Sequence, residues 1–237
     1  MNRLANKVAV ITGGSKGIGK AIALALSREG CHIVIAARSE DGLKKAERDI
    51  SKTGVKVLSA KVDVRKMKDV ESLARKVEQR LGSPHILINN AGIGRFAEVA
   101  KMKEEDFRST LETNLFGAFF CTKVFLPGMI HRKEGHIINI ASLAGKNTFA
   151  SGSAYCASKH ALIAFSECLM MEVRHHNIKV TAICPGTVQT DFSSGSRDKT
   201  WALTSEDVSK AVLDVLTTSG GSLISAVDLR PLRPQKR

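Results

Sequence analysis

Tyr155 and Lys159 are the residues whose types and spacing most directly suggest chemistry. They lie four positions apart in a stretch with helical periodicity, so both side chains should lie on one face of a helix. A nearby ammonium stabilises a phenolate and lowers the tyrosine pKa from about 10 toward the range of a general acid-base. Ser142, at the end of an expected strand, could hydrogen-bond the same substrate oxygen. Because such pairs are common on helices, the alternative is two ordinary surface residues; Tyr155 is, however, the only tyrosine in the chain.

A glycine-rich turn follows the first apolar segment and precedes a helical one, and it reads Thr12-Gly13-Gly14-Ser15-Lys16-Gly17-Ile18-Gly19. A backbone without Cβ atoms can turn tightly and let a pyrophosphate approach the free N–H groups at a helix N-terminus. The strand before the turn and the helix after it provide the context that a dinucleotide site requires. The turn therefore predicts a dinucleotide-binding site rather than a plain strand-helix connection.

The end of the second expected strand indicates which dinucleotide binds. NAD sites place an acid there for the ribose 2′-hydroxyl, whereas this sequence has Ala37 followed by Arg38. Arg38 can donate two parallel hydrogen bonds to a 2′-phosphate, and Lys16 can add a second positive charge. The sequence thus favours NADP(H), unless Arg38 and Lys16 are ordinary exposed charges.

Short β-branched segments alternate with helical ones along the chain, which is typical of βαβ units. They predict an α/β protein, a single-domain Rossmann fold over 1–237 with a doubly wound, seven-stranded parallel sheet and helices on both faces. Strands are expected at 7–12, 31–36, 55–62, 85–90, 135–141, 178–184 and 222–228, and helices at 17–29, 40–53, 66–81, 103–130, 153–176 and 204–217. Pro127-Gly128 should end or bend the fourth helix. Residues 186–203 are expected to form a substrate loop, and 231–237 a flexible basic tail.

These motifs together resemble the short-chain dehydrogenase/reductase family. The glycine turn is followed, in the family's order, by Asp63-Val64, Asn89-Asn90-Ala91-Gly92, Asn114, Ser142, the Tyr155/Lys159 pair and Pro185 to Thr190. The resemblance implies catalytic roles for Asn114, Ser142, Tyr155 and Lys159, with Asn114 holding a water in a proton relay or, alternatively, capping a helix kink. It also implies that the cofactor is bound by Gly13, Ser15, Lys16, Gly17, Ile18, Gly19, Arg38, Asp63, Val64, Asn90, Ala91, Gly92, Tyr155, Lys159, Pro185, Gly186, Val188 and Thr190.

The expected activity is NADPH-dependent reduction of a small ketone or aldehyde, with 3-oxoacyl-acyl carrier protein reduction as the alternative. A cofactor-sensing regulator is disfavoured because the four catalytic positions are intact. Leu143, Phe149, Thr187 and Phe192 suggest an apolar substrate pocket. The ending after residue 222 lacks the V-x-G-G strand usual in acyl-carrier reductases, while helices 103–126 and 153–173 are apolar nearly all round, as in a homodimer or homotetramer.

Composition limits the other possibilities. The chain has 237 residues, with 36 Lys and Arg against 23 Asp and Glu, a net charge of +13. Aromatic residues make up only 5% and do not alternate with basic ones, so nucleic-acid binding is not expected. The five cysteines include no C-x-x-C pair, which argues against a metal site and favours a reducing compartment. Without a signal peptide or a long apolar run, we expect a cytoplasmic protein that does not enter membranes.

Overall fold

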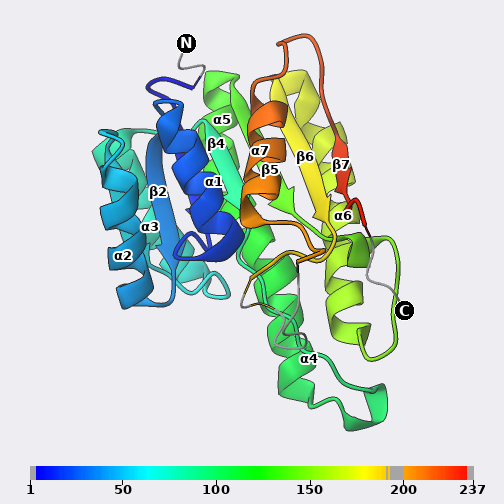
Figure 1. Ribbon diagram of the computed structural model, residues 1–237. Coiled ribbons are helices and arrows are strands. Elements are labelled where there is room, and N and C mark those ends of the chain that lie inside the picture. The colour runs from blue at the N-terminus through cyan, green and yellow to red at the C-terminus, as the bar shows by residue number, and fades with distance from the viewer. Residues whose placement is uncertain (1–3, 191, 193–199, 234–237) are drawn as a thin grey trace.

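The computed structural model describes residues 4–190, 192 and 200–233 of the chain (Figure 1). Within them, seven parallel strands form one sheet in the order β3-β2-β1-β4-β5-β6-β7. The strands are β1 (Val8–Thr12), β2 (His32–Ala37), β3 (Val57–Lys61), β4 (Ile86–Asn89), β5 (Gly135–Ile140), β6 (Ile178–Pro185) and β7 (Ala226–Leu229). The expected α/β fold with a doubly wound parallel sheet is confirmed.

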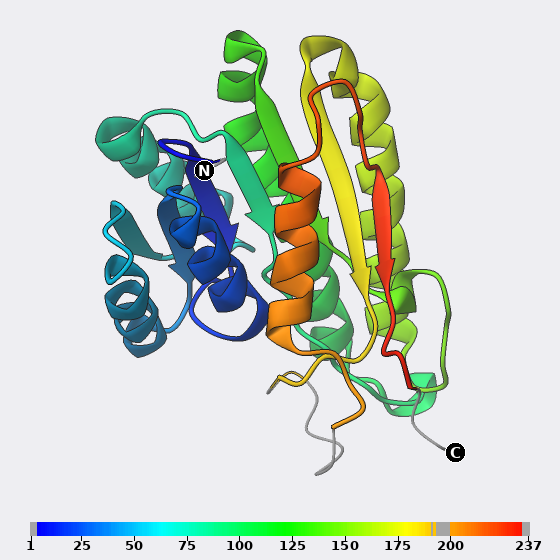
Figure 2. The ribbon, with the colours of Figure 1, turned by 45° about the horizontal axis from the view of Figure 1, so that its top comes forward.

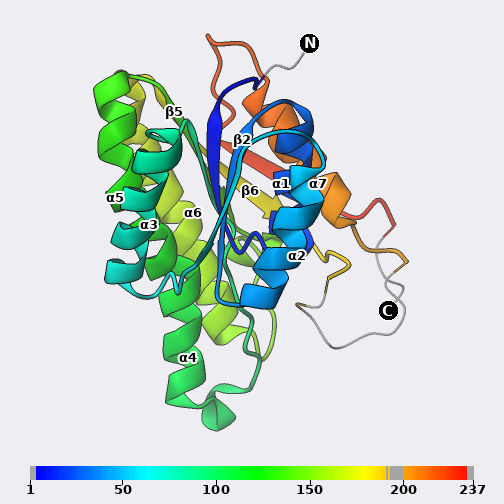
Figure 3. The ribbon, with the colours of Figure 1, turned by 90° about the vertical axis from the view of Figure 1, so that its left-hand side faces the viewer.

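Helices cover both faces of the sheet, as Figure 3 shows from the side. On one face lie α1 (Gly17–Arg28), α2 (Glu40–Ser51) and α7 (Ser205–Leu216), and on the other lie α3 (Met67–Leu81), α4 (Glu104–Leu111), α5 (Gly117–Arg132) and α6 (Ser153–Val173). Short helical turns occur at η1 (Val99–Lys101), η2 (Glu112–Phe116), η3 (Leu143–Gly145) and η4 (Arg174–His176). Each face has its own apolar core. The strands of the sheet centre are therefore buried on both sides, which explains their continuous β-branched sequences.

The strand order reverses between β1 and β4, because β2 and β3 extend the sheet on one side and β5 to β7 on the other. All seven strands point the same way, so their carboxyl ends meet at one edge of the sheet, the lower edge in Figure 2. Ligands of doubly wound sheets bind in the crevice at this reversal point. The first strand and its glycine turn end there.

The fourth expected helix, at 103–130, forms two α-helices joined by a π-helical turn, η2. Pro127 does not end it, since α5 continues to Arg132. Phe125 and Met129 are buried on either side of the proline and anchor the helix to the core. Because Pro127 itself is exposed, the carbonyl that lacks its helical N–H partner is near solvent, where the loss is tolerated.

Two further features differ from the sequence-based expectations. Strand β7 begins at Ala226 instead of residue 222, because the segment before it forms a loop whose Ser219 and Ser222 carbonyls accept hydrogen bonds from Lys179 Nζ. Among the described residues, the helical stretch Glu104–Arg132 is long and apolar enough to cross a membrane by length and composition alone. This stretch consists of α4, η2 and α5. Its apolar residues are explained by the packing of α5 against α3 and the sheet.

Buried His136 on β5 leads to a prediction about stability. Its Nε2 lies 2.9 Å from Thr181 Oγ1, and burial lowers the pKa of His136 from 6.5 to about 3. The unfolded chain binds a proton there that the folded chain does not, so the free energy of unfolding should fall as pH drops from 6.5 toward 3. The expected slope is about 1.4 kcal/mol per pH unit. Denaturant titrations of His136→Gln should show a flatter dependence between pH 6.5 and roughly 5.

The matched control is His131→Gln, because His131 is exposed on α5. Burial also lowers the pKa of His85. Because both variants retain His85, its contribution to the pH dependence of the free energy of unfolding is the same in each. Equal slopes for the unaltered chain and His136→Gln would show that His136 is not neutral in the folded state.

Candidate active site

The glycine turn after β1 has the geometry that its sequence predicts. Gly13 and Gly17 have φ angles of +65° and +53°, in the left-handed region that favours glycine. A Cβ on Gly13 would lie 2.8 Å from Asn90 Nδ2. The same amide donates to the carbonyl oxygens of Thr12 at 2.9 Å and Gly13 at 3.2 Å, so Asn90 fixes the shape of the turn.

Gly19 has a packing role in this turn. Its Cα lies so close to the Gly13 carbonyl and to Asn90 Nδ2 that no Cβ could be accommodated. Gly19 is buried and does not line the cavity described below. The structure therefore places it behind the site, although we expected it among the cofactor contacts.

Thr12, at the end of β1, is a site residue that our sequence reasoning missed. Its hydroxyl donates to Ile88 O at 3.3 Å and accepts hydrogen bonds from the N–H groups of Asn90 and Ala91, both at 3.0 Å. Thr12 thus joins the carboxyl end of β1 to that of β4 across the reversal point. Its position just before the first glycine was the only signal for this role.

Helix α1 begins at Gly17, and its first residues, Gly17 and Ile18, line the large cavity described below. Lys16 makes no side-chain capping bond there, and the first turn contains no acidic residue. The N-terminal N–H groups and the positive end of the helix dipole are therefore not neutralised by a carboxylate of the first turn. This arrangement is suited to a phosphate group.

Tyr155 and Ser142 come together from different elements. Ser142 follows β5 and caps η3, where its Oγ accepts a hydrogen bond from Ala144 N at 3.1 Å. Tyr155 lies in the first turn of α6, and a hydrogen bond between its hydroxyl and the Ser142 side chain favours the phenolate. Burial is the larger effect, and the pKa of Tyr155 is raised above 10. The expectation that Lys159 lowers this pKa is thus not met by the chain alone.

Lys159 is buried one turn after Tyr155 in α6. Its Nζ donates to Ile140 O at 2.8 Å and lies 5.8 Å from the centre of the Tyr155 ring. Burial lowers the pKa of Lys159 from 10.5 to about 8. A Cβ on Gly92 would lie 3.7 Å from this Nζ, so the glycine leaves space in front of the ammonium. A hydroxyl of a bound molecule could occupy that space.

Asn114 supports the site from the π-helical turn. Its Oδ1 accepts from Ile93 N at 2.8 Å, and its Nδ2 donates to Ile93 O and to Ser158 Oγ, both at 2.9 Å. The side chain thereby joins the strand-end segment 90–93 to α6. It also lies in a helix irregularity, as the alternative interpretation of this asparagine proposed. Asn114 does not line the cavity itself.

A cavity of about 1470 Å³ opens at the carboxyl edge of the sheet and brings most of the expected residues together. Among its lining residues are Gly13, Ser15, Lys16, Gly17, Ile18, Arg38, Asp63, Val64, Asn90, Ala91, Gly92, Ser142, Tyr155, Lys159, Pro185, Gly186, Val188 and Thr190. It also includes residues 187–190, 192 and 201 of the expected substrate loop, while 191 and 193–199 lie outside the described residues. Of the expected tail, Pro231 lines the cavity, and 234–237 lie outside the described part.

One end of the cavity carries the charges expected around a phosphorylated ribose. Arg38 is exposed at the end of β2, and its charge helps to lower the pKa of Asp63. The main cause of that lowered pKa is Arg65, whose Nη2 lies 2.5 Å from Asp63 Oδ2. Because Arg65 pairs with this carboxylate, Asp63 opposes an incoming phosphate less than a solitary acid would.

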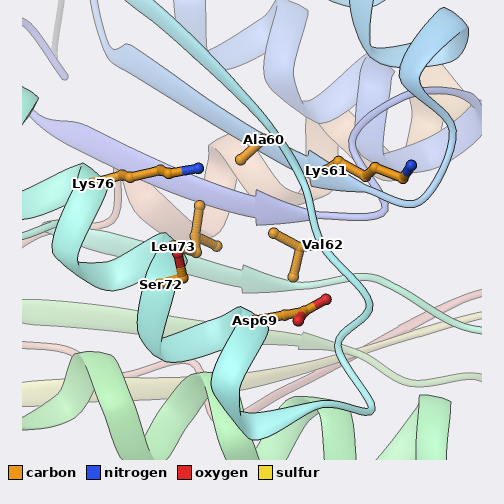
Figure 4. A pocket seen from close by; sticks show the side chains of 7 residues that line it. All are labelled: Ala60, Lys61, Val62, Asp69, Ser72, Leu73 and Lys76. Carbon is orange, nitrogen blue, oxygen red and sulfur yellow. The ribbon is translucent and has the colours of Figure 1, made fainter.

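A second hollow, of about 120 Å³, lies between β3 and α3 (Figure 4). Its polar groups include Asp69, which accepts a hydrogen bond from Asp63 N at 3.1 Å and so stabilises the strand end. This hollow contains none of the candidate catalytic residues. The described residues include no group of three or more His, Cys, Asp or Glu side chains that could hold a metal ion.

The site fits a dinucleotide by its own geometry. The backbone packs closely on glycine Cα atoms, the first residues of α1 line the cavity without a side-chain cap, and Tyr155 and Lys159 line the same cavity. Gly13, Ser15, Ile18 and the α1 N-terminus would hold the phosphates, and Gly92 and Lys159 a ribose. The fold and this site define a Rossmann-type oxidoreductase.

Comparison with known proteins identifies the family. The family model described as short chain dehydrogenase matches residues 7–201. A candidate ketoacyl reductase of Streptomyces coelicolor is 35% identical over 207 residues, covering 85% of this chain and 79% of the relative. A metagenomic short-chain oxidoreductase in complex with NADP has a TM-score of 0.87 at 35% identity and covers 98% and 100% of the two chains. An NAD+-bound xylitol dehydrogenase has a TM-score of 0.86 at 27% identity, and the match covers 96% of this chain and 98% of that one. The chain belongs to the short-chain dehydrogenase/reductase family.

Trp201 should report on occupancy of the cavity. It is the only tryptophan and lines the cavity, and its Nε1 is buried without a hydrogen-bond partner among the described residues. A bound molecule changes the polarity around the indole, so its emission should shift when NADP+ and a substrate analogue bind together. Fluorescence titration with each ligand and with both tests this expectation. An emission spectrum unchanged by all three additions would place Trp201 away from the ligands.

Proposed function

We propose that this protein is an NADPH-dependent carbonyl reductase that converts a ketone or aldehyde to an alcohol. The observation that supports this most strongly is the convergence of Tyr155, Ser142 and Lys159 in the same cavity as the glycine turn. Residues 1–237 then act as one domain, and the described residues 187–190, 192 and 201 of the expected substrate loop line the cavity. A small carbonyl compound is the substrate.

The preference for NADP(H) is supported by Arg38 and Ala37. The structural neighbours include proteins with NADP and with NAD+, so their ligands do not decide between the cofactors. In this chain no acid stands at the end of β2, and the exposed guanidinium of Arg38 can bind a 2′-phosphate bidentately. Lys16 provides a further positive charge at the cavity wall.

The chain's own residues position the carbonyl and move the proton. When bound, the nicotinamide supplies the hydride. Tyr155 donates its proton to the carbonyl oxygen, and Ser142 hydrogen-bonds the same oxygen. Lys159 provides a positive charge that stabilises the resulting phenolate, and it can hold a ribose hydroxyl. Asn114 holds segment 90–93 against α6. The resemblance to the family further implies that Asn114 helps to hold a water in the proton relay.

Reduction of a 3-oxoacyl group on an acyl carrier protein is the second candidate. It is supported by the name of the Streptomyces relative and by the net charge of +13, which would attract an acidic carrier. The two candidates share the same chemistry at Tyr155. They differ in whether the substrate is free or attached to a protein.

We also propose that the protein forms a homodimer or homotetramer in the cytoplasm. Phe116, Phe119 and Met171 are 49%, 40% and 58% exposed on η2, α5 and α6, which gives this side of the molecule an apolar surface that a second copy would cover. All five cysteines are free, as is usual in a reducing compartment.

The test is NADPH oxidation by the purified protein over a panel of aldehydes, diketones and an acetoacetyl thioester, free and on an acyl carrier protein. Turnover of free ketones is expected, and a strong preference for the carrier-bound thioester would favour the second candidate. The control is Tyr155→Phe under the same conditions. Absence of oxidation with every compound would overturn the proposed function.

A further inference from the structure

Three phenylalanines stand exposed around the substrate side of the cavity. Phe96 follows β4, Phe149 precedes α6 and Phe192 follows β6, and they are 46%, 49% and 42% exposed. All three line the cavity. Apolar side chains gathered at a concave surface mark a place where a ligand removes them from water.

The three rings form a connected row with Tyr155. The ring centres of Phe96 and Tyr155 are 5.6 Å apart in an edge-on arrangement. The ring centres of Phe192 and Tyr155 are also 5.6 Å apart, with the rings tilted. Phe149 extends the row through Phe96 at 5.9 Å. Because the substrate carbonyl must meet the Tyr155 hydroxyl, a substituent on that carbonyl is brought against these rings.

Glycines hold the rings against bare backbone. A Cβ on Gly94 would lie 2.7 Å from Phe96 and 3.0 Å from Phe192, and a Cβ on Gly152 would lie 2.6 Å from Phe149. Each ring therefore packs on a surface that only glycine provides, while much of the residue remains exposed. The row is positioned by the local backbone and leaves aromatic surface available to a ligand.

The described lining of the cavity contains few acidic groups. Arg95 and Arg230 line the cavity, while Asp63, in the ribose-phosphate region, is the only acid among its described lining residues. The side-chain amides of Asn147 and Gln189 also line the cavity. The rings in contact with Tyr155 itself, however, are those of Phe96 and Phe192, which cannot accept hydroxyl protons of a polyol.

We infer that Phe96, Phe149 and Phe192 form an aryl subsite and that the preferred substrates are carbonyl compounds with an aromatic ring near the carbonyl group. The inference rests on the proposed reductase function and specifies its substrate class. An aromatic substituent would make edge or offset contacts with this row, which a small alkyl group cannot make.

The test compares two 3-oxo esters that differ only in the terminal group, ethyl benzoylacetate and ethyl acetoacetate. For the unaltered protein, kcat/KM with NADPH should be at least about tenfold higher for the phenyl compound, which corresponds to about 1.4 kcal/mol. Phe96→Leu and Phe149→Leu keep an apolar side chain but remove the ring. Each should lower the phenyl-to-methyl ratio by about fivefold or more.

Phe107→Leu is the matched control, because Phe107 is 37% exposed on α4 and does not line the cavity. It should leave the ratio unchanged. A ratio near one for the unaltered protein, or a ratio that neither cavity variant lowers, would overturn the aryl subsite while the reductase function stands.

Calorimetry separates the two proposals. The corresponding alcohols, ethyl 3-hydroxy-3-phenylpropanoate and ethyl 3-hydroxybutanoate, are titrated into the protein without cofactor. The phenyl alcohol should bind at least about tenfold more tightly, and Phe96→Leu should remove most of this difference. If neither these esters nor any compound of the panel described above is reduced, the proposed function fails and this comparison alone decides on the subsite. Equal affinities for the two alcohols would then overturn it.

Discussion

Tyr155→Phe should lower the turnover number for carbonyl reduction by roughly a hundredfold to ten-thousandfold, the usual contribution of a general acid-base group. The substitution removes only the hydroxyl, and the ring can keep its contacts with Phe96 and Phe192. The affinity for NADPH should therefore change little. Steady-state kinetics and a direct NADPH titration measure the two quantities separately, and near-normal turnover would contradict the mechanism.

The ionisation of Tyr155 provides an independent measurement for the same prediction. In the chain alone, burial raises the pKa of this phenol. With NADP+ bound, the charge of the oxidised ring adds to that of Lys159, and the pKa should fall below 10. Because the chain has one tyrosine, the difference in absorbance between the unaltered protein and Tyr155→Phe isolates its titration. A pKa that stays above 10 in the NADP+ complex would contradict the assigned role.

Arg38→Asp should reverse the cofactor preference. The unaltered protein is expected to bind NADPH at least about tenfold more tightly than NADH, a difference of about 1.4 kcal/mol that one charge-assisted contact can supply. Aspartate would repel the 2′-phosphate and accept hydrogen bonds from the two ribose hydroxyls of NADH. The combined change in the affinity ratio should reach about a hundredfold or more.

The matched control for Arg38 is Arg65→Gln. Arg65 is also near this end of the cavity, but it pairs with Asp63 and is not among the lining residues. Loss of the Arg65 charge should lower the affinity for both NADPH and NADH, and NADPH should remain the more tightly bound cofactor. Equal affinities of the unaltered protein for NADPH and NADH would overturn the assignment of Arg38.

The sequence was most informative where local pattern and chemistry coincide. β-branched segments predicted the parallel strands, and the glycine turn predicted a tight connection after the first strand, where Gly13 has a left-handed backbone. The spacing of Tyr155 and Lys159 predicted their proximity, which the contact of Lys159 Nζ with the Tyr155 ring bears out. These features depend on neighbouring residues and on helix or strand periodicity.

Features that depend on tertiary packing were not predictable in the same way. The π-helical turn at Asn114 is accompanied by its three hydrogen bonds to Ile93 and Ser158, which are far from it in sequence. Burial of Phe125 and Met129 allows α5 to continue past Pro127. The raised pKa of Tyr155 likewise follows from burial, which exceeds the effect of nearby groups in the chain alone.

The aryl subsite shows the same limit. Sequence reasoning placed Phe149 and Phe192 in an apolar pocket, whereas Phe96 gave no signal because it lies in a loop without periodicity. The row of rings forms only when the ends of β4 and β6 and the start of α6 meet at one edge of the sheet.

The most direct test of the central claim is isotope transfer from NADPH in which both hydrogens on the reactive carbon of the nicotinamide are replaced by deuterium, so that the label is transferred whichever face reacts. The protein is incubated with this cofactor and a ketone that it turns over, and the alcohol is analysed by mass spectrometry. We expect one deuterium on the carbinol carbon for each NADPH consumed, and almost none of this product with Tyr155→Phe. Consumption of NADPH without deuterated alcohol, or equal product from Tyr155→Phe, would contradict a carbonyl reductase that uses Tyr155 as its proton donor.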